Sequence, residues 1–136
     1  METTQNLFPA ISLLIVDDDK MARDILNLMI AREFPNSSIY FAENGITGLE
    51  LFKEHTPEIV ITDISMPVMD GIQMAGAIRS LKGDTKFIVL TGYSETDYSS
   101  EINEFGIKEY ILKPIVFKKL FAAIENCIAE ITLERR

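Results

Sequence analysis

Short runs of consecutive apolar residues alternate along this chain with longer stretches in which apolar residues recur at every third or fourth position. Unbroken runs rich in β-branched residues are typical of strands covered on both faces, and the spaced stretches are typical of amphipathic helices. The runs predict five strands, at residues 11–16, 38–42, 59–61, 87–90 and 108–112. The spaced stretches predict five helices, at residues 20–34, 46–55, 72–81, 94–105 and 116–133.

The alternation of strands and helices predicts an α/β fold: a doubly wound, five-stranded parallel sheet with right-handed crossovers and helices on both faces. The two strongest apolar runs, at residues 11–16 and 59–61, are expected at the centre of the sheet, because central strands are buried on both faces. By analogy with one of the two common doubly wound arrangements, the expected strand order is 2-1-3-4-5.

The first and the last predicted helices carry clear apolar stripes. In the first helix the residues at helical spacing are Met21, Ile25, Leu28 and Met29, and for most of the chain's six methionines such spacing favours packing over an adaptable binding surface. In the last helix the apolar residues fill an arc of about 140°, which is wider than the ~100° of a core-facing stripe. One edge of that arc consists of Phe117, Phe121 and Ile128. Either this edge stays partly exposed and serves a partner or a second copy, or the sheet covers the whole arc.

A chain of 136 residues suits one domain, which we place at residues 11–131, after a flexible lead-in at 1–10 and before a helix end or linker at 132–136. The net charge of -8, without a Lys/Arg cluster, argues against a nucleic-acid partner. No apolar run approaches the ~20 residues of a membrane span, and the N-terminus lacks the pattern of a signal peptide. The single cysteine, Cys127, cannot form an internal disulfide, which favours a cytoplasmic location.

Polar residues follow the predicted strands at the points where ligands bind in open α/β sheets. Asp17 and Asp18 come after the first strand and Asp63 after the third. If those strands are neighbours, three carboxylates crowd one crevice, and their repulsion raises a proton affinity or demands a cation such as Mg²⁺. Thr91 and Lys113, after the fourth and fifth strands, can bind phosphoryl oxygens. This set of residues suits phosphoryl transfer.

Each of these residues also has a simpler interpretation. Asp63 could merely cap the next helix, Thr91 could be a strand-end hydroxyl, and Lys113 could be a surface lysine. Asp19 continues the acidic run, and we expect it to face solvent or to cap the first helix. His55 is the only histidine, and its place at a predicted helix end favours a solvated side chain over a phosphocarrier.

Four segments resemble the receiver domains of two-component response regulators, the CheY-like family. They are LLIVDDD at 13–19, ITDISMPVMDG at 61–71, VLTGY at 89–93 and YILKP at 110–114. The resemblance extends over about residues 11–131, and the segments stand in the family's order, each at the end of a predicted strand. It implies a flavodoxin-like fold and a phosphorylation-dependent signalling switch, which catalyses only its own phosphorylation and dephosphorylation.

The resemblance also implies roles for the residues of the acidic crevice. Asp63 matches the phosphoacceptor, which takes a phosphoryl group from a phosphohistidine on a sensor histidine kinase or a phosphotransfer protein. Asp18 matches a direct Mg²⁺ ligand and Asp17 a ligand that acts through water. Asp63 itself and the backbone carbonyl of Ser65 complete the protein's share of the Mg²⁺ ligands.

Further roles concern the phosphoryl group and the output of the signal. Thr91 and Lys113 match the residues that hold the phosphoryl oxygens. Thr91 and Tyr110 match the pair that switches on activation, and Pro114 matches a proline that follows a cis peptide bond. The output surface would consist of the fourth predicted helix, the fifth strand and the last helix, and would bind a second copy or a downstream effector.

Three other functions fit less well. A phosphatase of the haloacid dehalogenase kind would use Asp17 and Asp19, but that family expects Thr or Val where this chain has Met21, and the chain has no room for a cap domain. A flavodoxin would cradle a phosphate in its first loop, but the acidic run at 17–19 would repel it. A degenerate receiver that only mediates binding is disfavoured, because no reactive position is missing.

Overall fold

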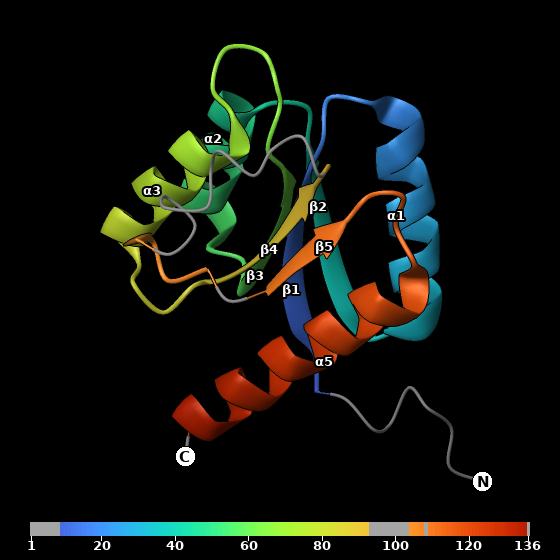
Figure 1. The fold of residues 1–136 in the computed structure, drawn as a ribbon. Helices are drawn as coiled ribbons and strands as arrows, with labels where there is room; N and C mark the ends of the chain where they lie inside the picture. The colour runs from blue at the N-terminus through green and yellow to red at the C-terminus, as the bar shows by residue number, and fades with distance from the viewer. Residues whose placement is uncertain (1–8, 93–103, 108, 136) are drawn as a thin grey trace, which may run out of the picture.

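The computed structural model describes residues 9–92, 104–107 and 109–135, which form five strands and four helices (Figure 1). The strands are β1 (Ile11–Val16), β2 (Ser37–Ala42), β3 (Ile59–Asp63), β4 (Lys86–Thr91) and β5 (Glu109–Leu112). The helices are α1 (Lys20–Glu33), α2 (Gly45–His55), α3 (Gly71–Leu81) and α5 (Phe117–Glu134). These elements confirm their predictions, with small shifts at the ends. The helix expected at residues 94–105 lies, apart from its last two residues, outside the described residues.

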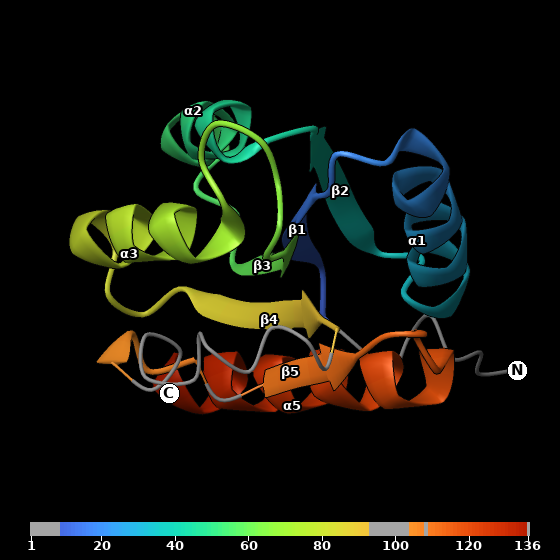
Figure 2. The same cartoon turned by 45° about the horizontal axis from the view of Figure 1, so that its top comes forward.

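All five strands are parallel and lie in the order β2-β1-β3-β4-β5, which confirms the predicted topology. Figure 2 shows the sheet between two helical layers, with α2 and α3 on one face and α1 and α5 on the other. No helix in the described part of the chain combines the length and the apolar character that a bilayer crossing needs.

The central strands explain why their sequences are unbroken apolar runs. In β1, Leu13 and Ile15 belong to the core under α1 and α5, whereas Leu14 and Val16 belong to the core under α2 and α3. Successive side chains of a strand point to opposite faces, so both faces need apolar residues when both are covered. The sheet therefore separates two cores that share its central strands.

The apolar stripe predicted on α1 lies mostly outside the core. Met21, Ile25 and Leu28 are 71%, 46% and 56% exposed, while Met29 is partly buried. The residues of α1 that are fully buried are Leu26 and Ile30. Helical spacing marks which residues share a face, but only a narrow strip of α1 touches the sheet, so most of the predicted stripe faces solvent.

The prediction for the edge of the α5 arc is partly confirmed. Phe117 and Phe121 are partly buried and pack against the core between α1, α5 and the sheet. The Phe121 ring meets Phe34 edge-on, with ring centroids 6.0 Å apart. Ile128, in contrast, is buried, because this part of α5 lies against the sheet rather than beside α1. The exposed part of the arc is therefore confined to the first turns of α5.

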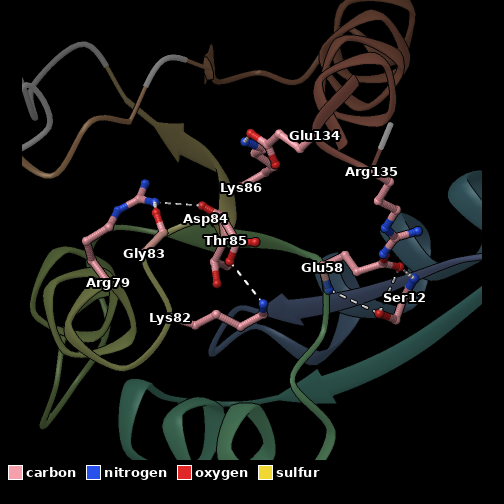
Figure 3. Close-up of polar contacts among 10 residues, drawn as sticks. All are labelled: Ser12, Glu58, Arg79, Lys82, Gly83, Asp84, Thr85, Lys86, Glu134 and Arg135. Atoms are coloured by element: carbon pink, nitrogen blue, oxygen red, sulfur yellow. Dashed lines mark hydrogen bonds and ion pairs between the residues drawn. The ribbon is translucent and has the colours of Figure 1, made fainter. Parts of the chain in front are cut away.

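Ion pairs connect the C-terminal end of α5 to the edge of the sheet where β3 and β4 begin, and Figure 3 shows the residues of two of these pairs. Lys86 Nζ at the start of β4 lies 2.5 Å from Glu134 and 3.4 Å from Glu130. Arg135 pairs with Glu58, which precedes β3. These contacts hold the last turns of α5 at the amino ends of the strands, whereas the acidic residues follow their carboxyl ends.

One residue at the end of α2 has an unfavourable backbone conformation. Thr56 caps the helix with φ 42° and ψ 59°, in the left-handed region that favours glycine. We expect Thr56→Gly to raise the free energy of unfolding by about 0.5–1 kcal/mol, as measured by urea denaturation. The matched control is Glu50→Gly inside the same helix, which should lower it by about 0.5–1 kcal/mol. A loss of stability in both variants would contradict this interpretation of Thr56.

Candidate functional site

The register of the parallel strands brings the predicted site residues to one edge of the sheet. Asp63, the last residue of β3, pairs with Leu90 of β4, so Thr91 lies one residue further along the neighbouring strand. Thr91 in turn pairs with the last residue of β5, and Lys113 follows directly. Asp17 follows β1, which pairs with β3 on its other side. Four strands therefore contribute to a single crevice.

Three carboxylates meet in this crevice. Oxygens of Asp17, Asp18 and Asp63 all lie within 4.8 Å of one another, and among the described residues these three are the group that could hold a metal ion. Asp17 and Asp63 are buried, whereas Asp18 is exposed. Lys113 supplies the opposite charge, with its Nζ 2.9 Å from Asp63 Oδ1. The structure thus brings together the acids and the lysine that the sequence predicted.

The surroundings of Asp17 disfavour the charged form of its carboxylate. Burial raises the pKa of Asp17 above its ordinary value, and the nearby charges of Asp63 and Asp18 raise it further. A hydrogen bond from the Asp19 N–H and the charge of Lys113 lower this pKa and offset part of the effect. Oxygen ligands that repel one another in this way, next to solvent, suit a hard divalent cation.

Asp19 takes no part in this group of acids, as predicted. Its Oδ1 accepts a hydrogen bond from Met21 N at 3.0 Å and caps α1. Its own N–H donates to Asp17 Oδ1 at 2.9 Å, and Arg23 Nη1 donates to the Asp17 carbonyl at 2.7 Å. The first turn of α1 therefore holds the backbone and the carboxylate of Asp17 in place.

The simpler interpretation of Asp63, as a helix cap, is wrong. Asp70 caps α3, and its side chain and that of Gln73 exchange hydrogen bonds with each other's backbone N–H. This capping box was not predicted, although the spacing of Asp70 and Gln73 in the sequence is typical of one. A Cβ on Gly71 would lie 2.1 Å from the Asp63 carbonyl oxygen, so only glycine lets α3 begin against the backbone of Asp63.

The remaining predicted residues surround the crevice at different depths. Thr91 is buried, and its hydroxyl donates to the Gly92 carbonyl at 2.9 Å. Ser65 is exposed in the loop after Asp63, and the peptide bond before Pro114 is cis, as predicted. The Tyr110 side chain is 58% exposed and does not line the cavity that contains the acids. In this structure the Tyr110 side chain therefore faces solvent.

An apolar wall beside the acids was not anticipated from the sequence. A cavity of about 530 Å³ contains the acids on one side and, on the other, apolar residues of α1, of the loop between β5 and α5 and of the start of α5. The apolar wall consists of Ala22, Ile25, Leu26, Pro114, Ile115 and Phe117. Helical spacing identified some of these residues as apolar, but it gave no sign that they border the acidic crevice rather than the core.

Comparisons with known proteins point in the same direction. A family model described as "Response regulator receiver domain" matches residues 13–125. YesN of Bacillus subtilis, an uncharacterized transcriptional regulatory protein, is 33% identical over 120 residues, which make up 88% of this chain and 33% of that protein. The chemotaxis protein CheY of Halobacterium salinarum is 29% identical over 116 residues, which make up 85% of this chain and 95% of that protein.

The REC domain of AraT, a response regulator from Geobacillus stearothermophilus, has a similar solved structure. Its TM-score is 0.85 at 28% identity, and the match covers 94% of this chain and all of that one. The chain spans a third of YesN and half of DctR, a probable C4-dicarboxylate response regulator of Priestia megaterium. The similarity to these two longer proteins is therefore confined to one part of each.

The charge balance of the crevice leads to a prediction for Asp17. Without metal at pH 7, Asp17→Asn should raise the free energy of unfolding by about 1 kcal/mol, because it removes a buried, repelled charge. The gain should shrink as the pH falls through the raised pKa of Asp17, because the protonated carboxyl of the wild type is also neutral. Urea denaturation in EDTA at a series of pH values measures both the gain in stability and its dependence on pH.

The control is Asp19→Asn, which keeps a good helix cap and should stay within about 0.5 kcal/mol of the wild type. If Asp17→Asn lowers stability at neutral pH, the carboxylates do not repel one another as the geometry indicates.

Proposed function

Because this chain belongs to the response regulator receiver domain family, we propose that it is a phosphorylation-dependent signalling switch whose phosphoacceptor is Asp63. The observation that carries the proposal is the position of the Asp63 carboxylate. It is buried at the end of β3, 2.9 Å from Lys113 Nζ and grouped with Asp17 and Asp18. A carboxylate held between a cation and a metal-binding pair of acids suits a nucleophile that attacks phosphorus.

In the proposed reaction, an oxygen of Asp63 attacks the phosphorus of a phosphohistidine on a sensor histidine kinase or a phosphotransfer protein. The new oxygen–phosphorus bond forms as the nitrogen–phosphorus bond breaks, and the donor imidazole leaves with its electron pair. Lys113 stabilises the negative charge on one phosphoryl oxygen. The Thr91 hydroxyl, which donates to Gly92 in this structure, turns to donate to another. Such positioning and charge stabilisation account for most catalysis of phosphoryl transfer.

Mg²⁺ would supply further neutralisation of charge on the phosphoryl oxygens. Asp18 would be a direct ligand and Asp17 would act through water, while Asp63 and the Ser65 carbonyl would complete the protein ligands. The spacing of the three carboxylates and the exposure of Asp18 support this assignment. An exposed carboxylate leaves space for the waters that Mg²⁺ usually keeps.

A phosphatase that uses Asp17 as nucleophile fits the geometry less well. Such an enzyme would employ Asp19 as a second acid, but the Asp19 carboxylate caps α1. The lysine of the crevice pairs with Asp63 rather than with Asp17. The family's activity as a signalling domain, rather than as an enzyme acting on other molecules, is therefore the better account.

The exposed stripe on α1 supports a docking site for the phosphodonor. Met21, Ile25 and Leu28 are spaced as one face of a helix, and Ile25 also lines the cavity that contains the acids. A helix of a donor protein that packs on this stripe and on the first turns of α5 would bring a phosphohistidine close to Asp63. Apolar anchors with this spacing are typical of helix–groove recognition.

The output surface is proposed on the other side of the crevice. Tyr110 and Leu112 are exposed and lie on the same face of β5. Movement of Thr91 toward a phosphoryl group would free space into which Tyr110 can turn, so a local charge change biases two positions of one side chain. Together with α5 and the segment at 94–105, this face would bind a second copy or a downstream effector.

The direct test is phosphorylation of Asp63. With acetyl phosphate and Mg²⁺, intact-protein mass spectrometry should show one added phosphoryl group in the wild type. Asp63→Asn should abolish the addition because the nucleophile is gone, and EDTA should suppress it because the acids then lack their cation. The control Asp70→Asn keeps a helix cap and should be labelled like the wild type. Undiminished labelling of Asp63→Asn would place the acceptor elsewhere.

Docking on α1 predicts a difference between protein and small-molecule donors. Ile25→Glu puts a charge into the stripe and should slow transfer from a histidine kinase or phosphotransfer protein by about tenfold or more. Its labelling by acetyl phosphate should change by less than about twofold, since a small donor needs no docking surface. The control is Leu81→Glu, an equally apolar and exposed position at the end of α3. Equal effects on both donors would rule out α1 as the docking surface.

A further inference from the structure

Within the described residues 104–107, Phe105 contacts α3. The Phe105 ring lies directly over Gly76, in the middle of that helix. A Cβ on Gly76 would lie 2.8 Å from Phe105 Cζ, closer than real side chains approach. The ring also packs against the core under α2 and α3. Glycine at this position therefore makes the space that the ring occupies.

One helical turn further on, Arg79 holds the same residue by its backbone. Its Nε donates to the Phe105 carbonyl at 2.9 Å, and its Nη1 donates to the carbonyls of Thr85, at 2.9 Å, and Gly83. Figure 3 shows the guanidinium directed at the loop between α3 and β4, and it also stacks over the Phe87 ring at 4.9 Å. We call Gly76, Arg79 and Phe105 the α3 latch.

Only a short path leads from the latch to the site. Gly106 makes a turn with φ 68°, Ile107 is buried in the same core, and β5 then runs for four residues to Lys113. Among the described strands β5 pairs with β4 alone, so one of its sides has no ladder to fix it. The contact of Phe105 with α3 therefore helps to set where β5 begins, and β5 carries Lys113 to its place 2.9 Å from Asp63.

The opposite end of α3 touches the acceptor. Gly71 begins the helix against the Asp63 carbonyl, and its N–H donates to the Ile64 carbonyl at 2.9 Å. The helix α3 thus contacts the backbone of Asp63 at its first residue, and it contacts Phe105, which precedes the lysine's strand, through Gly76 and Arg79. A helix of 11 residues spans about 16 Å and is stiff over that length.

We propose that the α3 latch is a positioning device for Lys113, which fixes the distance between the lysine and the Asp63 carboxylate. The inference rests on the proposed function for its effect on phosphoryl transfer, but the geometric claim stands apart from it. The latch touches no ligand of the proposed metal site. Loosening it should therefore impair charge stabilisation by Lys113 and leave the affinity for Mg²⁺ within about twofold, because misplacement of a catalytic group affects rate more than binding.

The experiment enlarges the side chain at residue 76 and shrinks the one at residue 105, first separately and then together. Gly76→Ala pushes the ring away, and Phe105→Leu leaves a gap above the glycine. Each single variant should slow labelling by acetyl phosphate several-fold, up to about tenfold, at saturating Mg²⁺. The double variant places the new methyl group against the smaller side chain and should recover most of the wild-type rate. Such non-additivity is the mark of a direct contact.

Two further measurements separate positioning from loss of stability. Urea denaturation of every variant shows whether the folded population changes, and Leu81→Ala on the exposed end of α3 is the control that should leave the rate unchanged. A crystal structure of Gly76→Ala should show a lengthened distance between Lys113 Nζ and Asp63 Oδ1. That distance tests the latch even if the wild type takes no phosphoryl group, an outcome that would overturn only the proposed function.

Additive effects of the two substitutions overturn the latch, as does a Gly76→Ala structure in which the Lys113–Asp63 distance is unchanged. A rate that falls only in proportion to the folded fraction also overturns it. A rate that falls in a fully folded variant, with Mg²⁺ affinity retained and Lys113 displaced, supports it.

Discussion

Mutual repulsion of the carboxylates at the ends of β1 and β3 is the constraint on which the rest of the site depends. Parallel pairing of these strands places Asp17 and Asp63 side by side, and burial removes the water that would otherwise screen them. Lys113 offsets part of this repulsion by its contact with Asp63. The repulsion is therefore only partly compensated, and an arrangement of this kind favours a bound cation.

Much of the fold could be predicted because burial in the sheet determines the residue types of each strand separately. Strands such as β1 and β3 are covered on both faces, so every position must be apolar and the run is visible without any knowledge of neighbours. The site followed from the same logic, since Asp17, Asp63 and Lys113 come directly after strands whose ends meet at one edge. The residues of the site could thus be predicted from the positions where the strands end.

Features that depend on contacts between distant residues could not be read in this way. The apolar spacing of α1 does not reveal that Met21 and Leu28 face solvent, because an exposed apolar stripe has the same spacing as a stripe in a core. Burial of Ile128 depends on where α5 crosses the sheet. The fit of Phe105 over Gly76 joins residues that no local pattern connects, and a glycine inside a helix gives no sign of what lies above it.

The division of the interior into two cores has a consequence for how this sequence can change. Leu13 and Leu14 are neighbours in the chain, but they are packed by different sets of helices on opposite faces of the sheet. A change of volume at Leu13 must be compensated by residues of α1 or α5, and one at Leu14 by residues of α2 or α3. The helical layer of α1 and α5, which carries the surface next to the acids, can therefore change while the layer of α2 and α3, which contacts the backbone of Asp63, stays constant. Changes of sequence in one helical layer are in this sense separated by the sheet from those in the other.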